Sequence, residues 1–415
     1  MNKKEFLKRT SLVFFIRIFG ALSSLIVTIV ISRNFSANDA GIFFLLTTII
    51  IIIGNISSLG YGNALLRFIS GFKAINNDKS LNSFLKEGLS KVFIFSSFAC
   101  LLFLLIHKPL SELLYGSEDI SVVFFTMGLS IPLTALIYVG SPVLQGLGRD
   151  LLAVLMDRIL LHLLFLTLLT IIFFFKVNIN LFNLSFIYFI SSLVVFVICF
   201  LSINRLIKLS DGFGKESFVP LKKSASYIWT GLLMTTASLY FCQLILAVFV
   251  EPSDVASFIV AQRISFVIGF SVLAIQYIAA PRFSRLYKLK RFDQLKSLAL
   301  FCSRICYLIA IPMCSILFIY SQESILLLFG EDYIYASSLL NVLLIGQFVN
   351  IITGPVVFLL LMTGNEKDVR NADLISGAFI ICSGIVLTFF FESMGAAVAT
   401  SLTMILKNLI CAYYA

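Results

Sequence analysis

The chain has 415 residues, of which 60% are hydrophobic and only 13% are charged, and its formal net charge is +10. Soluble globular proteins carry about 25% charged residues, so this composition excludes a soluble protein and predicts an all-α integral membrane protein. We interpret the positive charge as loop charge that faces one membrane leaflet, not as a surface for nucleic acid.

The first apolar segment, 11–32, contains a single charge, Arg17. A helix needs about 20 apolar residues to cross the ~30 Å hydrocarbon core, so this segment is a predicted span with a guanidinium inside it. On a helix, Arg17 shares a face with small and hydroxyl residues such as Gly20 and Ser24, which favours a cavity or another helix on that side. The alternative is that Arg17 snorkels to the cytoplasmic headgroups.

Twelve apolar segments of membrane-spanning length are predicted along the chain, including this first one. The predicted spans are 11–32, 41–60, 88–107, 120–140, 151–175, 181–203, 225–250, 256–280, 298–320, 335–361, 372–391 and 394–413.

Lys and Arg are concentrated in alternate connections between these spans, which predicts that both termini lie in the cytoplasm. The outward connections are short, which excludes an extracytoplasmic catalytic domain. The basic connections are the N-terminus, 61–91, Arg149, 204–223, 281–297 and the segment with Lys367 and Arg370, whereas the opposite connections carry only Arg33, Lys108 and Lys176.

The two halves of the chain repeat one another. Asp39 and Asp254 each follow the first span of a half, and Pro142 and Pro355 recur at nearly the same offset of about 215 residues. Parallel repeats of this kind place a substrate site between two bundles that alternate its access. The predicted domains are a six-helix bundle over 1–205, a cytoplasmic linker over 206–224 and a second six-helix bundle over 225–415.

Motifs of enzymes and metal sites are absent from the sequence. It has no GxxxxGK[ST] loop, no HExxH and no GxSxG, and its eight cysteines lie in apolar segments without metal-ligand spacing. We therefore expect no enzymatic activity, no cofactor and no bound metal. Of the two histidines, His162 is expected to make a hydrogen bond in the core.

Charges inside the predicted spans are the strongest functional signal, because ionisable residues at depth mark pathways or ion partners. Asp157 is the candidate for proton or sodium coupling, and the alternative is an internal salt bridge with one of the arginines. Lys407 is interpreted as a snorkelling anchor. Besides this anion, we single out four cations in the spans: Arg17, Arg158, Arg263 and Lys407.

Amides lie beside these cations, with Gln262 and Gln276 in the same predicted span as Arg263. Arginine binds phosphate in a bidentate way, and amides and hydroxyls such as that of Ser24 suit sugar hydroxyls. The alternative is interhelical hydrogen bonding.

Arg67 and Arg282 occupy equivalent ends of two predicted spans on the cytoplasmic side. They are candidates for a cytoplasmic gate, and the alternative is that they are ordinary positive-inside charges.

Three segments carry a resemblance to a known family: 59–68 (LGYGNALLRF), 144–149 (LQGLGR), and Gly354–Pro355 followed by 361–367 (LMTGNEK). They are similar to the polysaccharide transporter family, which includes the Wzx-type O-antigen flippases and shares a superfamily with MATE exporters and the lipid II flippase. The resemblance implies two six-helix bundles in a V shape. It also implies a cationic central cavity, where Arg17 and Arg263 would fall by helix position.

The resemblance further implies the transfer of an undecaprenyl-pyrophosphate-linked oligosaccharide, such as an O-antigen unit of lipopolysaccharide biosynthesis, across a bacterial cytoplasmic membrane. The implied partners are this lipid-linked glycan, the bilayer, and polymerase and chain-length proteins of the same pathway. The alternative is a MATE-like antiporter of small solutes or drugs, which would require several intramembrane carboxylates, whereas Asp157 is the only candidate.

Overall fold

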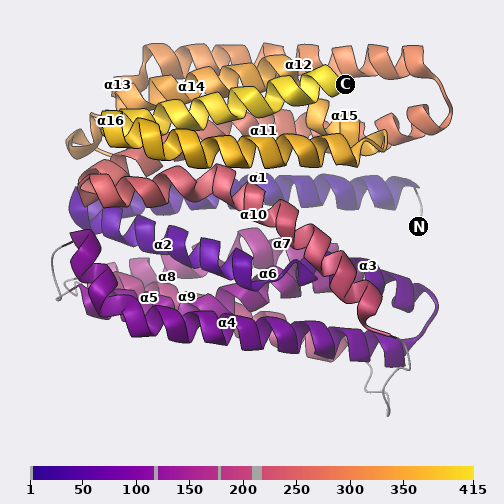
Figure 1. The fold of residues 1–415 in the computed structure, drawn as a ribbon, viewed down its shortest axis with the longest axis horizontal. Helices are drawn as coiled ribbons and strands as arrows, with labels where there is room; N and C mark the ends of the chain where they lie inside the picture. Colours follow the sequence, from indigo (N-terminus) through magenta and orange to yellow (C-terminus); the bar gives the residue numbers. More distant parts are fainter. Residues whose placement is uncertain (1–2, 116–119, 176–178, 208–216) are drawn as a thin grey trace. The chain divides into compact units, whose positions relative to one another are not determined.

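The computed structural model describes residues 3–115, 120–175, 179–207 and 217–415. Within these ranges the backbone forms helices and turns and no strand, which confirms the predicted all-helical class. Figure 1 shows the helices in chain order. The helices of the first half are α1 (Lys3–Asn34), α2 (Ala37–Ser57), α3 (Tyr61–Ala74), α4 (Asp78–Tyr115), α5 (Ser121–Gly128), α6 (Ser130–Gly146), α7 (Asp150–Arg158), α8 (Leu160–Phe174) and α9 (Leu181–Leu206).

The remaining helices are α10 (Val219–Phe249), α11 (Pro252–Lys288), α12 (Phe292–Ile319), α13 (Ser321–Leu328), the short 3₁₀ helix η1 (Glu331–Tyr333), α14 (Ala336–Thr353), α15 (Val356–Met362) and α16 (Glu366–Tyr414).

Among the described residues, eight helices are long and apolar enough to cross a membrane, or up to nine if α7 and α8 form one bent span. These two helices meet at an angle of 51°. Parts of α1 and α11 have side chains outside the described residues, so the count of twelve spans stays a prediction.

The last helix, α16, contains both of the final predicted spans. Its backbone leaves the helical region at Glu392, where φ is 50° and ψ is −131°. A Cβ atom on Gly395 would lie 1.9 Å from the carbonyl oxygen of Leu387, so the chain reverses direction here and two helical arms, 366–391 and 393–414, lie against each other. The predicted boundary between these two spans therefore coincides with a hairpin turn.

The predicted span 335–361 is interrupted where the sequence has Gly354–Pro355. Helix α14 ends at Thr353, and α15 begins at Val356. Gly354 has a positive φ of 70°, which favours glycine, and the proline has no N–H to continue the helix.

Helix α3 was not expected, because its residues belong to the predicted cytoplasmic connection 61–91. It packs against α4 and α6. Leu65, Ile69 and Phe72 are buried on one face of α3, at helical spacing, so this connection is an amphipathic helix that covers part of the core.

The chain folds into two compact units that share three helices. Unit 1 comprises 1–27 and 46–233, and unit 2 comprises 28–45 and 234–415, so α1, α2 and α10 each contribute to both. This grouping differs from the domains predicted at 1–205, 206–224 and 225–415. The grouping does not test whether the two halves of the chain repeat one another. Residues 208–216 of the predicted linker lie outside the described residues.

Helix α10 shows how one helix serves both units. In unit 1, the indole Nε1 of Trp229 donates a hydrogen bond of 2.9 Å to the carbonyl oxygen of Ile56. In unit 2, a Cβ atom on Gly377 would lie 2.8 Å from the Sδ atom of Met234, so α10 packs closely on the first arm of α16.

The hairpin turn of α16 predicts a stabilising substitution. A non-glycine residue in this backbone conformation costs roughly 1–3 kcal/mol, so Glu392→Gly is expected to raise the free energy of unfolding by about 1 kcal/mol. Glu392→Ala is the matched control, because it removes the same charge and keeps the Cβ atom. Thermal unfolding in detergent measures both, and equal stabilities of the two variants would contradict the expectation.

Candidate functional site

A buried pair of amides joins α10 to α11 in unit 2. The Nε2 of Gln243 donates a hydrogen bond to the Oε1 of Gln262, whose own Nε2 donates to the carbonyl oxygen of Leu239 at 3.4 Å. Both glutamine side chains are buried. A buried amide without partners is costly, so these contacts satisfy Gln262 inside the unit. They support the alternative of an interhelical hydrogen bond at this position.

Arg263 follows directly on α11 and is half-buried. One helical step moves it about 100° around the axis from Gln262. The hydroxyl of Ser265 donates a hydrogen bond of 2.8 Å to the carbonyl oxygen of Gln262, so this part of α11 has polar groups on its buried side. Arg263 therefore lies at the edge of a buried polar segment, as its sequence neighbours indicate.

Two amides of α14 lie next to α11 at the level of Gly269. The Nδ2 of Asn350 donates a hydrogen bond of 3.3 Å to the Oε1 of Gln347. A Cβ atom on Gly269 would lie 3.6 Å from the same oxygen, so the glycine brings α11 close to these amides. The close approach at Gly269 therefore places polar groups of α14 next to α11.

The polar contacts continue from α14 into α16. The hydroxyl of Thr353 lies 3.4 Å from the Oδ1 of Asn408, and the Nδ2 of Asn408 donates to the carbonyl oxygen of Met404 at 2.9 Å. We call the whole set the unit 2 polar track; its members are Gln243, Gln262, Arg263, Gln347, Asn350, Thr353, Asn408, Lys407 and Asp373.

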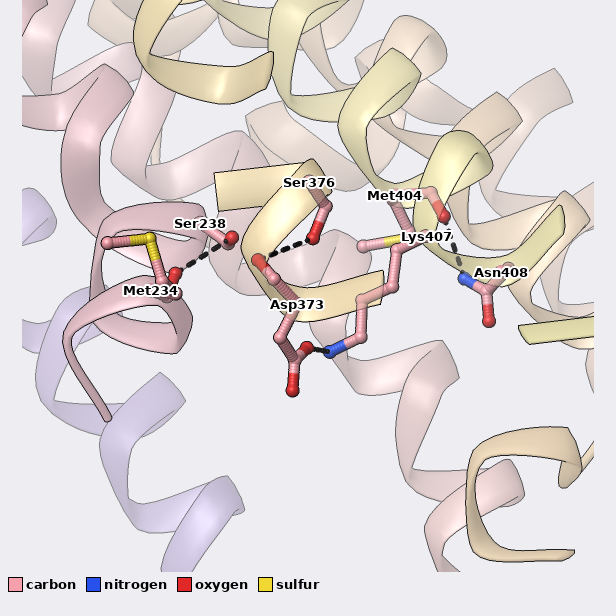
Figure 2. A network of polar contacts seen from close by, with 7 residues as sticks. All are labelled: Met234, Ser238, Asp373, Ser376, Met404, Lys407 and Asn408. Carbon is pink, nitrogen blue, oxygen red and sulfur yellow. Dashed lines mark hydrogen bonds and ion pairs between the residues drawn. The ribbon is translucent and has the colours of Figure 1, made fainter. Parts of the chain in front are cut away.

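The last contact of the unit 2 polar track is an ion pair between the two arms of α16. Figure 2 shows the Nζ of Lys407 directed at the carboxylate of Asp373, and the Nζ–Oδ1 distance is 2.6 Å. The side chains are 29% and 19% exposed. Lys407 is therefore not only a snorkelling anchor, because a second intramembrane acid holds it.

Sequence reasoning missed Asp373 as a partner, since it lies at the first turn of a predicted span and resembles a headgroup charge. Only the hairpin at Glu392 brings it opposite Lys407. No periodic pattern in the sequence reports a contact between two arms of a hairpin.

In unit 1, α1 and α8 meet at a polar contact. The hydroxyl of Ser23 donates to the carbonyl oxygen of Gly20 at 2.7 Å and lies 3.5 Å from the Nδ1 of His162. His162 is half-buried, in agreement with its expected hydrogen-bonded role. The neighbouring candidate Ser24 is also half-buried and has a polar contact of its own.

Asp157 lies at the end of α7, next to the 51° bend into α8, and is half-buried. Its role in ion coupling stays a prediction. The side chains of Arg17, Arg158 and Gln276 lie outside the described residues, so the roles predicted for them stay predictions as well.

The two gate candidates, Arg67 and Arg282, are both exposed. The guanidinium carbon of Arg67 lies 5.9 Å from the ring centroid of Phe68, a distance typical of a cation–π contact. Their exposure fits the alternative of positive-inside charges, and the gate stays a prediction.

Three acidic residues, Glu251, Asp254 and Glu392, lie near the start of α11 and the turn of α16. Burial raises the pKa of the Asp254 carboxyl, and the nearby carboxylates of Glu392 and Glu251 raise it further. Over the described residues, no group of three or more His, Cys, Asp or Glu side chains could hold a metal ion.

No protein-family model and no curated protein sequence matches the chain. Solved structures do match. An inward-facing multidrug resistance MATE family transporter of the MOP superfamily has a TM-score of 0.78 at 13% identity, over 95% of this chain and 93% of that chain. The lipid II flippase MurJ, in an inward closed conformation, has a TM-score of 0.78 at 14% identity, over 98% and 87%.

A mutant of the Vibrio cholerae MATE transporter VcmN has a TM-score of 0.68 at 18% identity, over 99% of this chain and 97% of that chain. At such identities the likeness shows the fold alone. The chain therefore has the fold seen in these MOP superfamily transporters, which is that of a multi-pass membrane protein.

The Asp373–Lys407 pair predicts a measurable coupling. Removal of one partner leaves a half-buried charge, so Asp373→Asn and Lys407→Met are each expected to destabilise the protein by about 1–2 kcal/mol. The double variant should recover much of this loss, because it removes both charges.

The matched control is the ion pair between Lys222 and Glu87, whose atoms are 3.4 Å apart and whose lysine is 53% exposed. A double-mutant cycle on this pair is expected to give about 0.5 kcal/mol or less. Unfolding in detergent measures both cycles. A coupling at Asp373–Lys407 no larger than that of the control pair would contradict an intramembrane ion pair.

Proposed function

We propose that this protein is a flippase that moves an undecaprenyl-pyrophosphate-linked oligosaccharide from the cytoplasmic to the outer leaflet of a bacterial cytoplasmic membrane. The transport proceeds by alternating access of two six-helix halves, 1–205 and 225–415. An ion gradient supplies the energy, with Asp157 as the coupling residue. The carried glycan is an O-antigen unit or a related polysaccharide repeat unit.

One observation carries the proposal: Arg263 is half-buried beside the buried amides of the unit 2 polar track. A guanidinium binds phosphate oxygens through parallel hydrogen bonds, and this attraction is stronger where water is scarce. Amides next to it suit sugar hydroxyls. The arrangement fits a substrate that joins a pyrophosphate to a carbohydrate.

The balance of intramembrane charge supports an anionic substrate. Lys407 and Asp373 neutralise each other, so this pair adds no net charge, and Arg263 contributes a positive charge to unit 2. With Arg17 and Arg158 of unit 1 included, cations outnumber Asp157. A cationic drug would be repelled by this set, whereas a pyrophosphate would be attracted.

The physical task is to carry a hydrophilic headgroup across ~30 Å of hydrocarbon. Fixed cations and amides replace the water around the pyrophosphate, while the lipid tail stays in the bilayer. In this proposal Arg67 and Arg282 receive the headgroup at the cytoplasmic side, and polymerase and chain-length proteins consume the product outside.

A second candidate is a MATE-like exporter of small solutes, which the fold favours equally, because the TM-scores to the MATE transporter and to MurJ are both 0.78. The two functions differ in the charge of the substrate. Deletion of the gene in its own host discriminates between them. Lipid-linked repeat units should accumulate on the inner leaflet while drug sensitivity stays the same; unchanged surface glycan would reject the flippase.

The role of Arg263 gives a sharper test in the same strain. Arg263→Ala is expected to reduce glycan export at least tenfold at normal protein abundance, because a charged hydrogen bond to phosphate contributes about 1.5–3 kcal/mol. Arg263→Lys keeps the charge without the bidentate geometry and should retain part of the activity. The measurement is surface glycan per copy of transporter.

The control is Arg304→Ala, since Arg304 is an exposed cation in the predicted span 298–320 of the same unit. It should export glycan normally. Equal losses in the Arg263 and Arg304 variants would show that general charge, and not the polar track, supports export.

A further inference from the structure

The backbone turn between α3 and α4 recurs between α11 and α12. In the first turn the backbone N–H of Asn77 donates to the carbonyl oxygen of Phe72 at 2.9 Å, and in the second that of Arg291 donates to Leu286 at 3.0 Å. Asn76 and Lys290 precede these donors, with positive φ of 53° and 55°. The two turns are alike in hydrogen bonding and in conformation.

The buried positions of the two turns also correspond. Ile69 before the first turn and Phe283 before the second are both fully buried. After the turns, Leu81 is 4% exposed and Leu295 is 9% exposed. Buried apolar side chains therefore anchor both turns at corresponding positions.

The exposed positions differ in charge, because the first turn carries only Lys73 and Lys79 with Asp78, whereas the second carries five cations with Asp293. Ala74, Asn76 and Asn77 of the first turn correspond to Lys288, Lys290 and Arg291 of the second, and Gly71 and Asn82 correspond to Arg285 and Lys296. The first turn forms without these cations. The fold of the turn therefore does not require them, and another reason must account for five exposed cations at one place.

Apolar side chains lie exposed among these cations. Tyr287, Leu289 and Phe292 are 40%, 52% and 57% exposed, and the rings of Tyr287 and Phe292 pack edge to face with centroids 6.0 Å apart. Aromatic rings next to Lys and Arg are typical of segments at a membrane surface, where rings enter the headgroup layer and cations meet phosphates.

A shallow, open hollow lies beside this turn, along the start of α12. Its lining changes from polar to apolar along the helix, from Asp293, Gln294 and Ser297 to Leu298 and Phe301. Asp293 is the only acid between residues 281 and 297, so cations dominate the surroundings of the hollow. Such a gradient fits a molecule with a charged head and an apolar tail.

We propose that the turn between α11 and α12, residues 285–301, binds anionic phospholipids of the bilayer through their phosphate headgroups. The cations attract the headgroup, the exposed rings enter the interface, and the hollow receives the upper part of one acyl chain. Lipid binding at this surface does not depend on the transported substrate. A negative result here therefore leaves the proposed function unaffected.

The first turn provides a variant that keeps the fold and removes the charge. Lys288→Ala, Lys290→Asn and Arg291→Asn together give the second turn the residues of the first. Asparagine suits the positive φ at position 290 better than lysine does. In the first turn Asn77 also caps its helix, since its Oδ1 accepts a hydrogen bond of 3.1 Å from the backbone N–H of Ser80. The triple variant is therefore expected to fold with native stability.

The experiment titrates the full chain in neutral detergent with dihexanoylphosphatidylglycerol or dihexanoylphosphatidylcholine and follows the rise of the unfolding temperature. Each cation near an anionic lipid contributes about fivefold in affinity, so the triple variant should bind the phosphatidylglycerol at least tenfold more weakly. Added salt should weaken binding to the native chain more than to the variant.

The control variant is Lys79→Gln, Lys91→Gln and Lys223→Gln, which removes three exposed cations from unit 1 and lowers the net charge equally. It should bind the phosphatidylglycerol within about twofold of the native chain. Equal losses in both triple variants would overturn the proposal, and so would equal binding of phosphatidylcholine. Displacement of the lipid by inorganic pyrophosphate at similar concentration would also overturn it, because the surface would then bind any polyanion.

Discussion

The absence of water in the hydrocarbon core is the constraint on which this structure depends. Every backbone N–H and C=O at that depth must find a partner inside the protein, and helices satisfy this requirement within each segment. Interruptions fall where special residues allow them, as at Gly354–Pro355, or where the chain turns, as at Glu392. Gly395 fits the second case, because only a residue without a side chain lets the two arms of α16 approach so closely.

Some polar side chains meet the same constraint by pairing across helices. The amides of Gln243 and Gln262 join α10 to α11, and the charges of Asp373 and Lys407 join the arms of α16. Such contacts fix the helices of unit 2 relative to one another.

Three helices belong to both units, and each is held at both ends. Ser23 of α1 contacts His162 in unit 1, whereas Arg33 near the end of α1 donates hydrogen bonds to the last carbonyl groups of α13 in unit 2, at 3.1 Å for Leu328 and 2.9 Å for Leu326. The last carbonyls of a helix have no partner within it, and that of Leu326 also accepts from the backbone N–H of Gly330 at 3.2 Å. Because α1, α2 and α10 each contribute residues to both units, they belong to the packing of both.

Composition and hydrophobic periodicity alone determined that the chain is a bundle of membrane helices, whereas the functional role of the charges at depth stays a prediction. Local sequence could do this because membrane insertion depends on the apolar content of single segments. Tertiary structure decided the rest. It buried one face of α3, brought Asp373 to Lys407, and engaged Gln262 with Gln243. These contacts join residues far apart in the chain or on different helices, and no local pattern reports such distances.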